Sequence, residues 1–480
     1  MGRHTGFLIV ALLTGFAVST VALRTKSLQL QPGLAPINDS SGVCPGTDMT
    51  AVSTERNSTV ILNSLRPDSL LIIGSLDSSG APHPIRITVR SVANGNPQPA
   101  PTTTVPLHTA VLSHALSEPD RLDLDENRDG SILPTTSQII RHRNFRVPRF
   151  ESSGTRRELC EATIVSESPR VSVYLEDNLL TDFDATLRFR SDLICELLEN
   201  QVLALINEAM GPVADIDADG TLSIVIADLD RQSGSQSPPV RGCVTDQDFL
   251  PEGQTDFSGD VIYLDRHLPE EAALASLLAH ELTHAAILSY QLQLQQQASE
   301  VRTTDASGSA LRSSSARRIP SWLNEAAAHW MEHRLTPEVP GFAERIATFQ
   351  SASATAPVVA SDDYLTFASR RSGSRAAGYL FLKSLLKSDR QLRDFVLNDQ
   401  TLEERIERVT GSDFRQAFRH WMIEAAGIIE PETVGDLAGP EIVTQSVLYG
   451  TAVISIRLHH GAQSVAVSSD RAAQLEVMTR

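Results

Sequence analysis

The chain has 480 residues, too long for one ordinary domain and enough for roughly two to four folded units. Hydrophobic residues make up 41% and charged residues 21%, so the chain can bury enough apolar surface to exclude wholesale disorder. The net charge is −18 and no basic run is present, so phosphate backbones and anionic lipid would be repelled. Nucleic acid is therefore not expected as a partner.

The N-terminus predicts the compartment. Arg3 and His4 precede an apolar run, residues 7–23, which is the pattern of a secretory signal peptide over 1–23. The run is nearly long enough to cross a bilayer, so a retained anchor is the alternative. In both cases the body is exported, to the medium, the periplasm or the cell surface. A membrane is expected to be touched only through such an anchor, since no later segment is predicted to span one.

Four cysteines are present, namely Cys44, Cys160, Cys195 and Cys243. Export makes them candidates for two disulfides, in three alternative pairings. None of them forms a C-x-x-C pair, so the spacing excludes a four-cysteine zinc knuckle.

The composition changes several times along the first third of the chain. Residues 24–59 are rich in Pro, Ser and Gly and are expected to be a linker. Residues 60–150 are expected to form a β-rich N-terminal module, because short apolar segments separated by turn residues fill its first half. A propeptide that ends near Phe150 is a second interpretation of this region.

In the next region, residues 151–430, both strands and helices are predicted. We expect strands at 171–177, 222–229 and 261–265, an amphipathic helix at 188–210, and further helices to about residue 426. Strands return in residues 440–480 as a small C-terminal β module. Helices and strands are segregated rather than strictly alternating, so the fold class is predicted to be α+β.

The segment LLAHELTHAAI contains His280-Glu281-x-x-His284. On a helix both imidazoles project from one side, one turn apart, within reach of a single metal ion. Glu281 falls inside the apolar stripe of this helix, where a carboxylate is costly unless something nearby needs it.

A catalytic zinc ion takes three protein ligands and keeps a fourth position open. The candidate for the third ligand is Glu325, in the segment IPSWLNEAAAHWMEH, where Pro320 and Asn324 favour a turn or helix cap before a helix. Glu325, His329 and Glu332 would share one face of that helix. The Gln- and Ser-rich residues 291–315 are expected to be an exposed loop between the two helices.

These two motifs resemble those of the gluzincin metallopeptidases, and the chain is most similar to the hyicolysin-type neutral zinc metallopeptidases, more distantly to thermolysin. The resemblance covers about residues 170–428. It implies a thermolysin-like zinc peptidase domain in which His280, His284 and Glu325 bind zinc and Glu281 is the general base.

Family members often carry Tyr where this chain has Arg375, so the group that stabilises the oxyanion stays open. Tyr379, Tyr364 and His329 are the candidates for that role. For His329 we favour orienting a ligand, and Glu332 fits the same role.

Asp215-x-Asp217-x-Asp219-Gly220 resembles the first half of a calcium loop, but Ile226 stands where such a loop closes with an acid. A plain acidic turn is the alternative to a calcium site. The similar stretch 125–130 also lacks its closing acid.

The sequence thus predicts an exported zinc-dependent endopeptidase that hydrolyses peptide bonds of a protein or peptide substrate with a zinc-activated water. The alternative is a non-enzymatic protein that binds a surface or partner, with a structural or degenerate zinc site. Glu281 argues against this alternative, since a structural site has no use for a base.

Overall fold

The computed structural model describes the chain in separate stretches. These are residues 52–53, 59–63, 65, 69–76, 82–91, 104–106, 141–151, 154–231, 240–250, 259–304, 319–338, 340–353, 373–398, 400–429, 431–433, 441–449, 451–458, 462–469 and 475–479. The predicted signal peptide or anchor, Cys44, residues 125–130 and Tyr364 lie outside them. The mixture of helices and strands, largely segregated along the chain, agrees with the predicted α+β class.

Among the described residues, the strands that come before the H-E-x-x-H helix in the chain form one sheet, and this sheet supports the helix. Its strands are β6 (His142–Glu151), β7 (Gly154–Glu167), β8 (Val171–Glu176), β9 (Leu222–Ala227), β10 (Gly242–Cys243) and β11 (Val261–Asp265), in the order β10-β11-β9-β8-β7-β6. The central strands β8, β9 and β11 are parallel, and the outer pairings are antiparallel. The three predicted strands of this region are confirmed.

The central strands are buried on both faces. On one face, residues such as Val173, Ile224 and Ile262 pack into the core shared with the helices. On the other, Val225 and Tyr263 pack with Phe145 of β6 in a second core. This explains why β8, β9 and β11 are apolar throughout rather than alternating.

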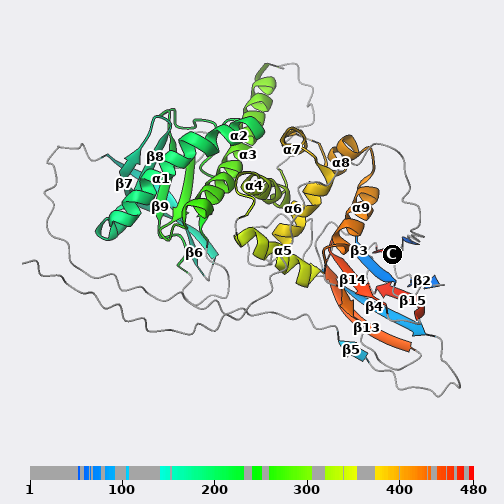
Figure 1. Ribbon diagram of the computed structural model, residues 1–480. Coiled ribbons are helices and arrows are strands. Elements are labelled where there is room, and N and C mark those ends of the chain that lie inside the picture. Colours follow the sequence, from blue (N-terminus) through cyan, green and yellow to red (C-terminus); the bar gives the residue numbers. More distant parts are fainter. Residues whose placement is uncertain are drawn as a thin grey trace, which may run out of the picture. The chain divides into compact units, whose positions relative to one another are not determined.

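The helices cover the sheet and continue beyond it (Figure 1). They are η1 (Asp177–Asp182), α1 (Ala185–Leu197), the π-helical turn η2 (Leu198–Val202), α2 (Leu203–Ala209), α3 (Glu271–Thr304), α4 (Ser321–Leu335), α5 (Pro340–Ala352), α6 (Ser374–Leu385), α7 (Asp389–Val396), α8 (Leu402–Thr410) and α9 (Phe414–Ala426). Asp184 caps α1 by accepting a hydrogen bond from Leu187 N, and Gly211 follows α2 with φ 103°. The predicted helix 188–210 is therefore confirmed, with a π-helical turn inside it.

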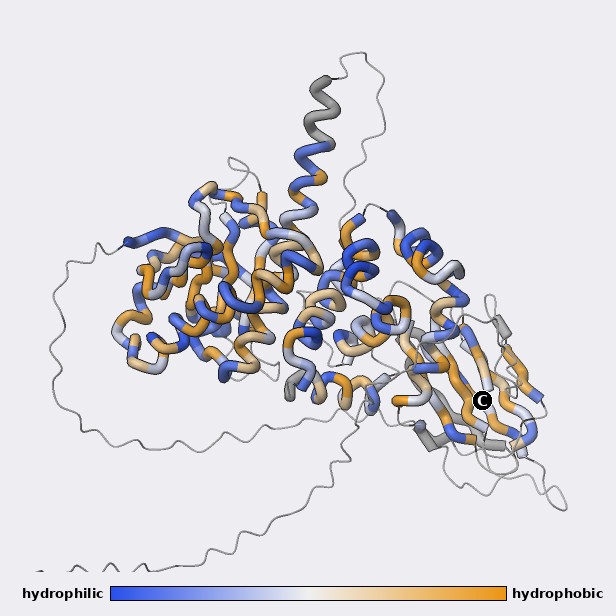
Figure 2. Tube along the Cα trace, turned by 45° about the horizontal axis from the view of Figure 1, so that its top comes forward, coloured by the Kyte–Doolittle hydropathy of each residue, from blue (hydrophilic) through white to orange (hydrophobic). Residues whose placement is uncertain are grey.

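Helix α3 corrects one prediction. The segment 291–304 continues the helix instead of beginning a loop, because Gln, Leu and Ala are good helix formers even in a repetitive sequence. In Figure 2 hydrophilic residues alternate with hydrophobic ones in the coloured part of this segment, up to residue 297. Among the described residues, α3 is also the one helix long and apolar enough to cross a bilayer, but 72% of its most apolar window is buried inside the protein, which accounts for that apolarity.

The β strands near the two ends of the chain belong together, so the expectation of two separate β modules is wrong. β15 (Ala462–Ser469) pairs with β2 (Thr59–Asn63) and with β4 (Pro82–Ser91). β3 (Leu70–Ser75) pairs with β14 (Val453–Arg457) and with β16 (Leu475–Thr479). The remaining strands of these two sheets are β1 (Val52–Ser53), β5 (Thr104–Pro106), β12 (Glu432–Thr433) and β13 (Glu441–Tyr449).

The physical reason is a shared apolar core. Strand residues of both chain regions, among them Val60, Ile87, Ile454 and Val467, are buried in one cluster, since neither group of strands could cover its own apolar face. Strand β6 is a further difference, because it pairs with β7 and so lies outside the module expected over 60–150.

The prediction of two disulfides is also wrong. Any two bridges among four cysteines require one bridge that does not involve Cys44, yet Cys160, Cys195 and Cys243 are not bridged to one another. Cys195 is buried with the helices, whereas Cys160 and Cys243 pack against the core on the other face of the sheet. The sheet therefore separates Cys195 from the other two.

Candidate metal centre

The site is built by two helices that pack against each other, α3 and α4. The first supplies His280, Glu281 and His284, and the second supplies Glu325, one turn before His329. Apolar neighbours bury both helices, so that His280 is 8% and Glu281 4% exposed. The structure thus brings the predicted zinc ligands together beside the predicted base, in surroundings with little water.

We call His280, His284 and Glu325 the metal cluster. Its facing atoms lie close together: the two Nε2 atoms are 3.2 Å apart, and the Glu325 oxygens lie 3.6 Å from His280 Nε2 and 3.8 Å from His284 Nε2. Ligand atoms about 2.1 Å from a tetrahedral ion stand about 3.4 Å from one another. The observed separations therefore match those of three ligands around one ion.

Two buried acceptor atoms at the cluster have no hydrogen-bond partner, Oε2 of Glu325 and Nε2 of His329. They lie 3.9 Å apart. His329 Nδ1 lies 2.8 Å from the Glu332 carboxylate and donates to it, so Nε2 carries a bare lone pair. A buried polar atom without a partner is costly, and two acceptors facing each other favour a bound cation between or beside them.

Burial and neighbouring charge set the ionisation of the cluster. Burial lowers the pKa of His284 to about 4, which keeps this imidazole neutral, the form that binds a metal. Burial raises the pKa of Glu325, but Arg375 and the nearby histidines outweigh it and bring the pKa to about 2. Burial lowers the pKa of His280, but the hydrogen bond to Glu332 and the charges of Glu325 and Glu281 outweigh burial and raise it, so a metal would have to displace a proton from this imidazole. Two imidazoles and one carboxylate are a common zinc ligand set.

Glu281 is held under the edge strand β10. Burial raises the pKa of its carboxyl to about 7. A Cβ atom on Gly242 would lie 2.9 Å from Glu281 Oε1, so any larger residue at this position would displace the Glu281 carboxylate. Sequence reasoning missed Gly242, because nothing in the local sequence places it against a residue of α3.

Three further residues orient the cluster, namely Asn324, Glu332 and Arg345, and only for Glu332 did the sequence predict this role. Asn324 does not cap α4 but lies in its first turn, and its Oδ1 is 2.8 Å from His284 Nδ1. His284 thereby donates from Nδ1 and leaves Nε2 for a metal. Glu332 lies 3.4 Å from His280 Nδ1 and accepts a 2.6 Å hydrogen bond from Arg345. The orienting role predicted for Glu332 agrees with these contacts.

His280, His329 and Glu332 form a second buried group that could hold a metal ion. Its Glu332 carboxylate already accepts from Arg345 and from His329. These hydrogen bonds satisfy the Glu332 carboxylate without an ion, so the metal cluster has the greater need of a bound metal ion.

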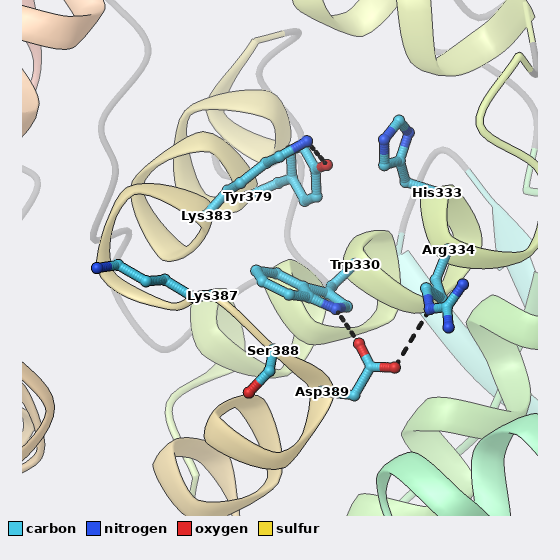
Figure 3. A pocket seen from close by; sticks show the side chains of 8 residues that line it. All are labelled: Trp330, His333, Arg334, Tyr379, Lys383, Lys387, Ser388 and Asp389. Carbon is cyan, nitrogen blue, oxygen red and sulfur yellow. Dashed lines mark hydrogen bonds and ion pairs between the residues drawn. The ribbon is translucent and has the colours of Figure 1, made fainter. Parts of the chain in front are cut away.

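The side chains considered for the oxyanion lie in different places. Arg375 lies 3.8 Å from Glu325, in the position where a tyrosine was considered. Tyr379 instead lines a pocket beside Lys383, which donates to its hydroxyl over 3.3 Å (Figure 3). Arg375 is therefore the cation that the fold adds to the cluster.

The predicted calcium ligands Asp215, Asp217 and Asp219 also lie within ligand reach of one another, and we call them the acidic turn. Arg143 of β6 forms ion pairs with both Asp217 and Asp219. Because the guanidinium already faces two of the three carboxylates, a calcium ion would have to compete with it. Calcium at this turn stays a prediction.

No protein-family model matches this chain, and a search of the curated proteins finds no relative. The geometry of the site therefore carries the functional argument.

Proposed function

We propose that the protein is a zinc-dependent peptidase of the gluzincin type, with His280, His284 and Glu325 as zinc ligands. The observation that carries the proposal is the buried Glu325 carboxylate, whose Oε2 has no hydrogen-bond partner and lies 3.6 Å from His280 Nε2, while its Oε1 lies 3.8 Å from His284 Nε2. A nitrogen, nitrogen and oxygen donor set is typical of catalytic zinc. The resemblance of the two motifs to hyicolysin-type peptidases supports the same assignment.

The residues around the cluster suit the hydrolysis of a peptide bond. Zinc at this site would lower the pKa of a coordinated water and polarise the substrate carbonyl. Glu281 lies next to the ligands along α3 without being one of them, so its carboxylate is available to accept the proton of the attacking water. The protonated carboxyl would then return that proton to the leaving amine.

Other side chains keep the site in order. Asn324 and Glu332 fix the ring orientations of His284 and His280, so that one nitrogen of each points at the cluster. Arg375 lies 3.8 Å from Glu325, with a third of its side chain exposed. Its guanidinium is our candidate to face the developing negative charge of the substrate oxygen.

The buried carboxylate of Glu281 distinguishes the proposed catalytic site from a structural zinc site. A structural zinc ion needs four protein ligands and no buried carboxylate beside them, whereas Glu281 is 4% exposed and lies next to two ligands. An exported endopeptidase acting on protein or peptide substrates is the function that these features favour.

The experiment uses the purified full chain and an unfolded protein such as reduced casein as substrate. Activity should disappear on treatment with a chelator and return when one equivalent of zinc is added, but not with magnesium. Glu281→Gln is the matched control for contaminating proteases, because it should stay inactive after the same treatment. No cleavage above that of Glu281→Gln, or cleavage above it that the chelator does not remove, would refute the proposal.

A further inference from the structure

The proposed base and its neighbouring histidines differ in how the fold holds them. His284 Nδ1 lies 2.8 Å from Asn324 Oδ1. His280 Nδ1 lies 3.4 Å from a Glu332 oxygen, so a polar group orients each of the two imidazoles. Among the described residues, by contrast, no hydrogen bond or ion pair reaches the Glu281 carboxylate. Something other than a polar partner therefore fixes the direction of this carboxylate.

The backbone of strand β10 covers the carboxylate instead. A Cβ atom placed on Gly242 would lie 2.9 Å from Oε1, 3.0 Å from Cγ and 3.1 Å from Cδ of Glu281. All three separations are shorter than the 3.4 Å at which ordinary van der Waals contact begins. The outer part of the Glu281 side chain therefore packs directly against the glycine, at a depth that leaves the residue 4% exposed.

The strand itself gives no reason for a glycine at this position. Gly242 is not among the described glycines with a positive φ, the conformation that favours glycine over other residues. Inside a strand glycine is unfavourable, because it offers no side chain to pack. The next residue, Cys243, does pack, against the core on the other face of the sheet. The glycine therefore serves something other than the stability of β10.

We infer that Gly242 is a positioning residue for Glu281, and that β10 carries a glycine here so that the carboxylate stays where the proposed mechanism needs a base. A methyl group at position 242 would move the carboxylate by at least about 0.5 Å, which is as much as a catalytic group tolerates. The carboxylate is the end of a flexible side chain and can rotate away, so the fold should lose little stability while the reaction loses its base. The inference rests on the proposed peptidase activity.

The test is a double-mutant cycle in the zinc-loaded full chain, with Gly242→Ala, Glu281→Asp and the variant that carries both changes. Gly242→Ala should keep one zinc per chain and a melting temperature close to that of the parent. It should lose at least about tenfold in kcat for casein hydrolysis, because the base is misplaced. Aspartate is one methylene shorter and does not reach the glycine, so in the Glu281→Asp background Gly242→Ala should cost less than about twofold.

Two further measurements separate positioning from a general effect on the strand. Cys243→Ala is the matched control, since it changes the neighbouring residue on the face of β10 away from Glu281. It should lower the melting temperature and keep the parental kcat. Crystal structures of the parent and of Gly242→Ala give a readout that does not depend on activity, namely a displaced Glu281 carboxylate in the variant.

Three results would overturn the inference and leave the proposed function intact. They are parental kcat in Gly242→Ala, equal losses of kcat in the two backgrounds, and a Gly242→Ala protein that does not fold, which would show that the strand needs the glycine. Absence of zinc-dependent cleavage by the parent would overturn the inference and the proposed function together.

Discussion

The metal cluster and the acidic turn both gather side chains that can hold a cation, but they differ in what else the fold supplies. At the acidic turn, Arg143 directly pairs with Asp217 and Asp219. At the metal cluster, Arg375 lies 3.8 Å from Glu325, beyond hydrogen-bond distance. Both Asp217 and Glu325 keep one buried oxygen without a partner, but only Glu325 faces a second bare acceptor, on His329.

This difference shows how to judge whether a group of acidic residues in a structure needs a bound cation. Carboxylates that already have a guanidinium as counter-charge are stable without an ion. Converging acceptors without a donor are not, and they mark the place where an ion is needed. By this criterion the metal cluster has a greater need of a cation than the acidic turn has.

The largest effect is expected from removing a ligand. His280→Ala and His284→Ala should each lose bound zinc and at least about a thousandfold of peptidase activity, because two remaining ligands hold zinc poorly. Zinc content by elemental analysis and casein hydrolysis measure the two effects. If His284→Ala kept one zinc per chain, the ion would instead be bound by His280, His329 and Glu332. That result would contradict the greater need of a cation inferred for the metal cluster.

A smaller loss is expected when a ligand is disoriented rather than removed. Asn324→Ala should weaken zinc binding about 10–100-fold, since His284 loses the acceptor that fixes its ring. Asn324→Asp keeps an oxygen at that position and is the conservative control. Competition with a metal-binding dye gives the affinities, and equal affinities for the alanine and aspartate variants would contradict the orienting role.

The acidic turn should respond to loss of its internal cation. Arg143→Met should lower the free energy of unfolding by about 1–3 kcal/mol, because Asp217 is left largely buried without a counter-charge. Arg141→Met, two residues earlier on the same strand region, breaks an exposed pair with Glu167 and should cost about 0–1 kcal/mol. Urea denaturation measures both variants.

Adding calcium to the same proteins tests whether Arg143 takes the place of an ion. If the guanidinium serves in place of an ion, added calcium should stabilise Arg143→Met more than the parent. Stabilisation of the parent by calcium, to the same extent, would show that Arg143 and the ion do not compete.

The last expected effect is a change of stability with pH. Burial raises the pKa of Asp260, beside the acidic turn, to about 7, above the 3.8 of an unperturbed aspartate. Asp260 therefore ionises at a lower pH in the unfolded chain than in the folded protein, and the folded parent protein loses stability as pH rises from about 4 to about 7. Asp260→Asn keeps the acceptor for Ile216 N and removes the ionisation, so its stability relative to the parent should increase across that interval. A difference that is constant with pH would refute the raised pKa.

Local patterns in the sequence were sufficient for the parts of the fold set by neighbouring residues. The spacing of His280 and His284 fixes both on one helix face, and the strand at 222–227 is apolar because both its faces are buried. What failed depends on contacts between distant residues. Nothing near Ile87 indicates that it pairs with Val467, so two β modules were expected where the strands interleave.

The same limit applies to the site. The proposed ligands and base lie in two short motifs, so that their proximity could be predicted, but the residues that support them come from other parts of the chain. Gly242, Arg345 and Arg375 reach the site only through the packing of β10, α5 and α6 around the two motif helices. Asn324 lies within a motif, yet its preference for caps and turns concealed its contact with His284.

The central claim is that Glu325 binds the metal while Glu281 acts on the substrate water, and one comparison tests it most directly. Zinc content and casein hydrolysis are measured on Glu281→Gln and Glu325→Gln, prepared identically. We predict about one zinc per chain and no activity for Glu281→Gln, which keeps every ligand but loses the base, and loss of both zinc and activity for Glu325→Gln. Full zinc with full activity in Glu325→Gln, or parental activity in Glu281→Gln, would contradict the account.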